Sequence, residues 1–302
     1  MSLLVKPFPI LQLALLTAVC LVLAGCGSSV APIPNPPAPV AGSPADARAL
    51  LNACLEAHGG AAGYARLHDV NVRFSSHWAA VGPKLQPKLS DTGYRQGSEE
   101  RYLATGRGPY TVGQDHRGPQ GEKFVARAGS GVAVWYNGAR SDDKEVQQAA
   151  SLVTDAYSMF LFGPGFFARR APALQRLPEA GDVDGTACDK LLAVLRPGFG
   201  LSAEDRVVLY IDRQTHLLRR VSFTLNTLES TRGAEVHVDL SEHKRLAGVM
   251  FPTRFYEHID RPVNLDAHRW ELLGFDVGRG YPAADLAGPG FKGKAAAPAR
   301  PR

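Results

Sequence analysis

Residues 207–225 have the sequence VVLYIDRQTHLLRRVSFTL, in which two apolar alternations flank a short polar link. Every second residue is apolar on both sides of this link, at Val207, Leu209 and Ile211 and then at Val221, Phe223 and Leu225. Because neighbouring strand residues point to opposite faces of a sheet, each half predicts a strand with one apolar face. The link, Asp212 to Thr215, is short enough to pair the two strands antiparallel.

The regions on both sides of this hairpin extend the same pattern. Strand-like alternation recurs at 236–240 and, nearer the N-terminus, at 70–74 and 132–136, while apolar residues follow helical spacing in 45–58 and 142–161. A run of strands with short links predicts an antiparallel meander. The fold class expected is therefore α+β: a curved antiparallel β-sheet, forming a half-open β-barrel, that wraps one or two helices within a single domain at 45–280.

The N-terminus predicts export. Lys6 is followed by an apolar run from Ile10 to Leu23, and then by Leu23-Ala24-Gly25-Cys26. This tetrapeptide resembles the lipobox of bacterial lipoproteins, which implies a signal peptide at 1–25 and acylation of Cys26 on its sulfur and amine. Two or three acyl chains would anchor the protein stably in a membrane. Gly27 in place of Asp implies, for a Gram-negative source, the periplasmic side of the outer membrane.

The segments flanking the domain carry little apolar sequence. Residues 26–44 are rich in proline and predict an extended tether behind the lipidated cysteine. Residues 281–302 are expected to form a disordered basic tail. The net charge of +5 falls to +4 without Lys6, and subtracting the four basic residues of 291–302 leaves the body near zero. The sequence of this body shows no basic stripe, so nucleic-acid binding is not expected.

At this point the order of elements resembles the LolA/LolB lipoprotein-carrier family over roughly 45–280. The resemblance depends on the secretory context, on an opening helix that ends in His58-Gly59-Gly60, and on strand-turn-strand units such as 207–221. It implies an incomplete barrel around helices, with an apolar cavity for acyl chains. The arginine that locks the lid of the soluble carriers matches no motif here, so the resemblance does not imply carrier activity.

The densest apolar stretch of the mature chain is the segment 159–167, MFLFGPGFF, which holds four of the chain's 13 phenylalanines. Two interpretations remain open. The segment is either a flap over a cavity or a tip that dips into the membrane, or it is a helix end that plugs the half-barrel from inside. On both, we expect the candidate ligand-binding residues to line the apolar interior or its mouth: Met159, Phe160, Phe162, Phe166 and Phe167.

Two cysteines remain after Cys20 leaves with the signal peptide and Cys26 is acylated. Cys54 and Cys188 are a candidate disulfide in an oxidising compartment, which would stabilise the fold by about 5 kcal/mol in the chain-entropy model. Cys54 lies on the apolar face of its helix, so a buried thiol is the alternative.

Polar clusters predict neither a metal site nor an enzyme. His237, Asp239, Ser241 and His243 share one strand face, but the two histidines would lie roughly 20 Å apart, too far to share an ion, so a solvated polar face is expected. The acidic residues around Gly185 predict a hairpin turn. The chain has no G-x-S-x-G elbow, H-E-x-x-H motif or P-loop. No cofactor is expected, although a catalytic triad of distant residues is recognised by geometry alone.

Three functions follow from these patterns. The first is a non-enzymatic, lipid-anchored periplasmic lipoprotein that binds an acyl chain or another hydrophobic ligand and handles lipid or lipoprotein at the outer membrane. The second is an envelope adaptor that binds a protein partner, and the third is a periplasmic hydrolase. The membrane is the expected partner in all three, through the acyl chains on Cys26.

Overall fold

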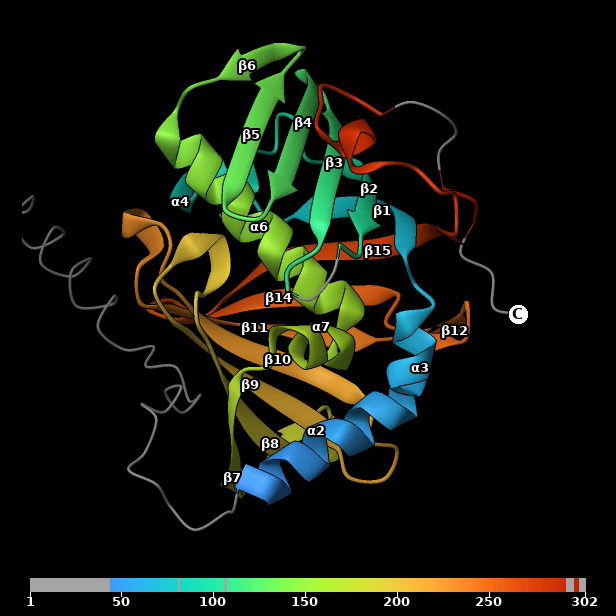
Figure 1. Cartoon of the computed structure of the whole chain (residues 1–302). Helices are drawn as coiled ribbons and strands as arrows, with labels where there is room; N and C mark the ends of the chain where they lie inside the picture. Colours follow the sequence, from blue (N-terminus) through green and yellow to red (C-terminus); the bar gives the residue numbers. More distant parts are fainter. Residues whose placement is uncertain (1–43, 81, 106–107, 292–295, 299–302) are drawn as a thin grey trace, which may run out of the picture.

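The computed structural model describes residues 44–80, 82–105, 108–291 and 296–298, and most of them belong to one large sheet (Figure 1). Thirteen strands pair in the order β6-β5-β4-β3-β2-β1-β15-β14-β11-β10-β9-β8-β7, each antiparallel to its neighbours. Their bounds are β1 Asp69–Trp78, β2 Gly97–Leu103, β3 Thr111–Gly118, β4 Gly121–Ala128, β5 Gly131–Tyr136, β6 Ala139–Ser141, β7 Ala173–Val183, β8 Thr186–Leu195, β9 Asp205–Asp212, β10 Leu218–Leu225, β11 Ala234–Ser241, β14 Arg254–Arg261 and β15 Leu265–Val277. The sheet runs from β6 to β7 without closing, which confirms the expected α+β half-barrel.

The hairpin predicted at 207–225 forms between β9 and β10. Val221 lies opposite Leu209, and Phe223 lies opposite Val207. Strands β7 to β11 follow one another along the sheet, which confirms the meander. One face of β9 packs in the main core, while Val208 on the other face packs in a smaller cluster on the convex side.

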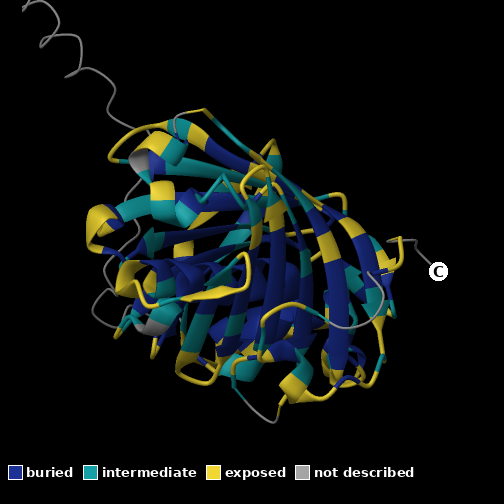
Figure 2. Cartoon of the chain, turned by 90° about the horizontal axis from the view of Figure 1, so that it is seen from above, coloured by how far each residue is buried: buried dark blue, intermediate teal, exposed yellow. Residues whose placement is uncertain are grey.

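Irregular register bends the sheet around its contents. Register shifts occur between Arg73 and Phe74 on β1, between Leu218 and Arg220 on β10, and between Glu257 and His258 on β14. An extra residue on one strand increases the local twist and bends it. The sheet therefore curls, and Figure 2 shows buried residues gathered inside the curve with exposed residues on the surrounding loops.

The helix α6, Lys144–Phe162, crosses the concave side of the sheet (Figure 1). Its N-terminus is capped by Asp143, whose carboxylate accepts hydrogen bonds from the backbone N–H groups of Glu145 at 2.9 Å and Val146 at 3.2 Å. Every residue from Ala149 to Phe162 is buried, as expected of a helix enclosed by a sheet. It confirms the helix predicted at 142–161.

Shorter elements complete the structure. The helices are α2 Pro44–His58, α3 Gly60–Ala65, α4 Gly82–Leu85, α5 Pro87–Ser90 and α7 Pro164–Arg170. The 3-10 turns are η2 Phe199–Leu201, η3 Glu229–Thr231 and η4 Ala283–Leu286, and β12 Lys244–Leu246 pairs with β13 Val249–Phe251.

The motif His58-Gly59-Gly60 joins the opening helix to the sheet. The Nδ1 of His58 lies 2.8 Å from the Met250 carbonyl oxygen, and its Nε2 accepts a hydrogen bond from the Leu218 backbone at 3.1 Å. Burial lowers the pKa of His58 to about 4, so the ring is neutral at pH 7. Gly59 has φ 124°, and a Cβ there would lie 2.7 Å from the Gly248 carbonyl oxygen, so only glycine fits.

The described part of the C-terminal tail is packed on the sheet, which corrects the expected domain boundary at 280. The Phe291 ring packs against Phe124 with ring centroids 5.1 Å apart, and the backbone N–H of Ala296 donates to Glu99 at 2.8 Å. Composition hid this because the segment buries few side chains and attaches partly through its backbone.

The expected signal peptide, the lipidated Cys26 and the tether lie outside the described residues, apart from Pro44 at the start of α2. Among the residues described, no helix is long and apolar enough to cross a membrane.

Candidate functional site

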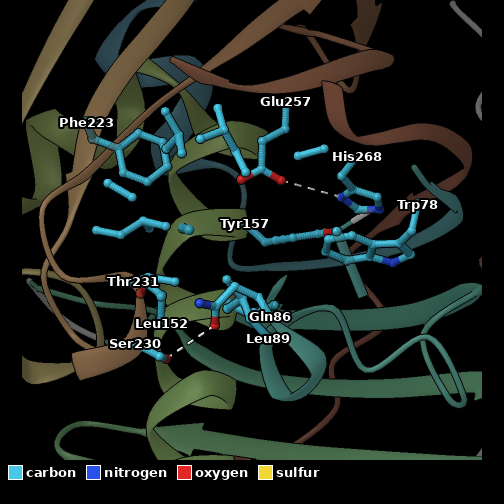
Figure 3. A pocket seen from close by; sticks show the side chains of 18 of the residues that line it. Trp78, Gln86, Leu89, Leu152, Tyr157, Phe223, Ser230, Thr231, Glu257 and His268 are labelled. Carbon is cyan, nitrogen blue, oxygen red and sulfur yellow. Dashed lines mark hydrogen bonds and ion pairs between the residues drawn. The ribbon is translucent and has the colours of Figure 1, made fainter. Parts of the chain in front are cut away.

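A cavity of about 250 Å³ lies between α6 and the concave faces of β10, β11, β14 and β15 (Figure 3). The α4–α5 segment, η3 and the β14–β15 turn surround its mouth. Its wall is mostly aliphatic and aromatic, and consists of Trp78, Gly82, Gln86, Leu89, Arg95, Leu152, Val153, Ala156, Tyr157, Phe160, Phe223, Leu225, Ser230, Thr231, Ala234, Val236, Glu257, Ile259, Pro262, Val263, Ala267 and His268.

Local sequence explains where this space arises. The residues of α6 that line it follow helical spacing, from Leu152 and Val153 through Ala156 and Tyr157 to Phe160. The short side chain of Ala156 stands midway along this face and leaves room that a larger residue would fill. Elsewhere the same helix packs against aromatic side chains, for example Phe162 against Tyr102 and Tyr110.

A stack of aromatic rings supports one wall of the cavity, and Trp78, Tyr157 and His268 of this stack line it. The indole of Trp78 stacks on His268 with centroids 3.8 Å apart, and His268 stacks on Trp270 at 4.7 Å. Trp270 in turn stacks on Phe255 at 5.0 Å and on Tyr157 at 5.2 Å. These rings come from β1, β14, β15 and α6, so the wall is held from several directions.

The guanidinium of Arg95 is the charged group of the cavity wall with the deepest burial, at 3% exposure of the residue. Arg95 precedes β2, and its guanidinium lies 5.1 Å from the Trp78 ring centroid and 5.6 Å from that of Tyr157. It donates to the carbonyl oxygen of Leu89 and, at 3.2 Å, to the Tyr157 hydroxyl. Both partners are neutral, so neither offsets the positive charge.

Glu257 faces Arg95's side of the cavity from β14. It alternates with Phe255 and Ile259, so it points to the concave face, and 18% of its side chain is exposed. Burial raises the pKa of Glu257 from 4.5 to about 7, while the nearby Arg95 lowers it. At neutral pH this carboxyl is therefore partly protonated, which is unusual for a glutamate.

His268 lies opposite Glu257 on β15, where the register shift places an extra residue. Glu257 pairs with His268 and His258 pairs with Asp266, which leaves Ala267 unpaired. Both Ala267 and His268 consequently line the cavity. Burial holds the pKa of His268 well below its ordinary value, so its ring is neutral.

The mouth of the cavity is polar on one side and apolar on the other. The hydroxyl of Ser230 donates to the Gln86 side-chain oxygen at 3.3 Å and joins η3 to the α4–α5 segment (Figure 3). Pro262 and Val263 form the opposite rim, and Val263 is 42% exposed. A single exposed hydrogen bond across the mouth is a weak restraint, worth about 1 kcal/mol.

Ser76, His268 and Glu257 are the residue types of a catalytic triad, with the histidine between the serine and the carboxylate. Their geometry is not that of a triad. The Ser76 hydroxyl lies 2.5 Å from His268 Nε2, whereas Nδ1 lies 3.9 Å from the Glu257 carboxylate, which is too long for a hydrogen bond. Ser76 does not line the cavity, and the low pKa of His268 makes it a weak base. This arrangement therefore does not favour a hydrolase.

The predicted apolar segment lies inside the barrel. Its five candidate residues are between 0% and 4% exposed and belong to the main core. Phe160 lines the cavity, whereas Met159, Phe162, Phe166 and Phe167 pack outside it. The position of this segment matches the internal plug and not a flap over the mouth.

The two remaining cysteines are separate buried thiols, so the candidate disulfide is absent from the structure. Cys188 shares the β8 face of Leu192 and Val194, which pack on the convex side of the sheet. Cys54 packs in the main core on the concave side. The sheet therefore separates the two thiols. The number of residues between Cys54 and Cys188 in the sequence does not reveal on which side of the sheet each one lies.

The polar strand face at 237–243 is less solvated than expected. His237 is 8% exposed and its Nδ1 lies 2.9 Å from the Asp260 carboxylate, while Asp239 pairs with Arg220 at 2.5 Å. His243 lies beyond the end of β11, with its ring 5.6 Å from that of His58. Neighbouring strands supply these partners, which a single strand's alternation does not reveal. In the described residues no three His, Cys, Asp or Glu side chains gather as metal ligands would.

Sequence reasoning missed the polar residues of the cavity, Arg95, Glu257 and His268. One signal was present: Glu257 occupies an inward position between Phe255 and Ile259, where an apolar residue is expected. Arg95 carries no such signal because it lies in a connecting segment, and only the folded chain brings it to the cavity.

Comparison with solved structures defines the fold: an open antiparallel half-barrel around a helix, as in the LolA superfamily. A LolA superfamily protein of Nitrosomonas europaea has a TM-score of 0.50 and 12% identity, covering 80% of this chain and 97% of that one. A DUF1329 family protein of Desulfovibrio piger has a TM-score of 0.49 and 11% identity over 80% of this chain and 96% of that one. A Vibrio parahaemolyticus domain named for outer-membrane lipoprotein sorting has a TM-score of 0.43 and 8% identity over 81% and 97%.

No family model matches the sequence, and no curated protein matches it. The likeness at 12% identity shows the fold alone.

Proposed function

We propose that this protein is a lipid-anchored envelope lipoprotein whose half-barrel binds a hydrophobic ligand, such as one acyl chain, without chemical conversion, at the periplasmic side of the outer membrane. The observation that carries the proposal is the apolar cavity of about 250 Å³ beside α6. The LolA-type fold supports it by analogy, because the half-barrel leaves such a space between sheet and helix.

The size of the cavity sets the size of the ligand. An engineered cavity of about 150 Å³ holds benzene, and pockets for drug-sized ligands begin near 300 Å³. A volume of about 250 Å³ therefore suits one chain and not a lipid with several chains. Each CH₂ group removed from water contributes about 0.8 kcal/mol, so a short chain of several carbons binds with useful affinity.

Ligand loading tests the proposal. The mature chain with Cys26→Ser, which needs no detergent, is stripped of lipid and incubated with decanoate and its methyl ester, and native mass spectrometry counts bound molecules. Ala156→Leu fills the space beside α6 and should abolish loading. The control Gln148→Leu makes the same helix more apolar at an exposed position and should load normally. Equal loading of both variants, or no loading of the parent chain, would refute ligand binding here.

The lipid anchor is tested separately. Cells expressing the full chain are fed an alkyne fatty acid, and incorporation is followed by click labelling and membrane fractionation. Labelling and membrane retention should depend on Cys26 and disappear in Cys26→Ser. Retention of Cys26→Ser in the outer membrane without label would show that another feature provides the attachment.

A further inference from the structure

The guanidinium of Arg95 in the cavity wall carries a buried positive charge that no ion pair within the described residues neutralises. A guanidinium has five N–H donors. In Arg95 one donates to Leu89 and one to Tyr157, and Nε, which is fully buried, has no hydrogen-bond partner in the described chain. No carboxylate of the described residues forms an ion pair with it. A buried charge without a counterion is costly, so this end of the cavity favours an anion.

Two acidic side chains lie near Arg95, and neither forms a hydrogen bond or an ion pair with its guanidinium within the described residues. Glu100 is fully buried behind it and is occupied by the hydroxyls of Ser98 and Tyr102. Glu257 faces the cavity, and in the described residues its carboxyl has no hydrogen-bond partner. A carboxyl that burial keeps partly protonated at neutral pH can donate a hydrogen bond to a neighbouring anion from its protonated form.

The geometry points to a single-chain carboxylic acid, of the free fatty acid class, as the ligand of this cavity, with its carboxylate bound between Arg95 and Glu257 and its chain running along α6 toward Pro262 and Val263. This inference builds on the proposed function and names the chemical class of its ligand. Arg95 would contribute charge-assisted hydrogen bonds, which are the strongest available to a carboxylate.

The direction in which the ligand enters the cavity distinguishes a free acid from an acyl chain that is attached to a larger molecule. Glu257 lies five residues before Pro262, the residue that follows the end of β14, which is roughly 16 Å of extended chain, so Glu257 is remote from the rim formed by Pro262 and Val263. A chain that is esterified or amide-linked to a protein or to glycerol has its carbonyl end at the attachment point. It would enter methyl end first and place hydrocarbon beside Arg95.

Proton uptake should accompany binding. The groups that face Glu257 are Arg95, His268 on β15 and the Tyr157 hydroxyl on α6, while β11 places Val238 opposite it. A bound carboxylate disfavours ionisation of Glu257, so the complex holds its proton to higher pH than the free protein. Because the pKa of Glu257 in the free protein is about 7, affinity should fall as the pH rises above 7, by at most tenfold per pH unit.

Ligand competition tests the inference on the unmodified site. Decanoic acid, methyl decanoate and decylamine are titrated at pH 6 into the mature chain with Cys26→Ser, and affinity is measured by calorimetry. One charge-assisted pair corresponds to roughly tenfold or more in affinity, so the acid should exceed the ester by that factor and the amine should bind weakest. A second series at pH 8.5 should show weaker binding of the acid.

Two variants locate the effect. Arg95→Gln should remove the preference for the acid while the ester still binds, and Arg95→Lys should restore part of it. Glu257→Gln imitates the protonated carboxyl, so it should keep the preference and flatten the pH dependence between 6 and 8.5. If Arg95→Gln does not fold, the ligand series on the parent chain and on Glu257→Gln decides the question.

The outcomes are distinct. An ester or an amine that binds as tightly as the acid overturns the acidic ligand but leaves ligand binding by the half-barrel intact. A preference for the acid that survives in a folded Arg95→Gln places the head group elsewhere and also overturns the inference. Failure of all three probes to bind removes the proposed function itself.

Discussion

Replacement of Phe162 by alanine tests whether the apolar segment 159–167 is a structural plug. Phe162 is fully buried at the end of α6, stacks on Tyr110 with centroids 4.1 Å apart, and meets Tyr102 edge-on at 5.3 Å. Truncation of a buried phenylalanine costs about 3–5 kcal/mol, and the two ring contacts place this one near the upper end of that range. We therefore expect Phe162→Ala to lower the free energy of unfolding by about 4 kcal/mol.

Urea unfolding followed by tryptophan fluorescence measures this loss, and the thermal midpoint should fall by roughly 8–16 °C. Leu273→Ala is the control, because Leu273 is 43% exposed on β15 and its loss should cost less than about 0.5 kcal/mol. A flap or membrane-dipping tip would contribute little to stability in solution. A loss below about 1 kcal/mol in Phe162→Ala, comparable with the control, would refute the internal plug.

Three further predictions follow from the site and the core. The denatured, unreduced mature chain with Cys26→Ser should show two titratable thiols, from Cys54 and Cys188, and a count near zero would restore the disulfide. Glu257→Gln should stabilise the protein at pH 8 and not at pH 4. The pKa of Glu257 in the folded state is about 7, above its ordinary value of 4.5, so wild-type stability falls as the pH rises between these values, by up to about 3 kcal/mol. Equal unfolding midpoints of the two proteins at pH 8 would contradict this. Ser76 should not react with a fluorophosphonate probe, because His268 is too weak a base; labelling that Ser76→Ala abolishes would reopen the hydrolase hypothesis.

The meander shows most clearly which features the sequence predicts. The alternation at 207–225 predicted both strands and their antiparallel pairing, because period-two burial is a local property of a strand with one apolar face. The helix at 142–161 was equally visible, and the structure places it at 144–162. The domain boundary at 280 was wrong because the tail attaches to the sheet partly through backbone hydrogen bonds, which composition does not reveal.

The sequence by itself determined the strand meander that begins with the 207–225 hairpin and the helices at 45–58 and 142–161, and it predicted an apolar interior around 159–167. The tertiary structure alone decided which face of the sheet each cysteine occupies, and that Arg95, Glu257 and His268 meet beside α6. The physical reason is that secondary structure follows from the spacing of neighbouring residues, whereas a binding site depends on distances across a curved sheet. Those distances are set by strand order and by bulges such as the one at Ala267 on β15, opposite Glu257, which local patterns do not encode.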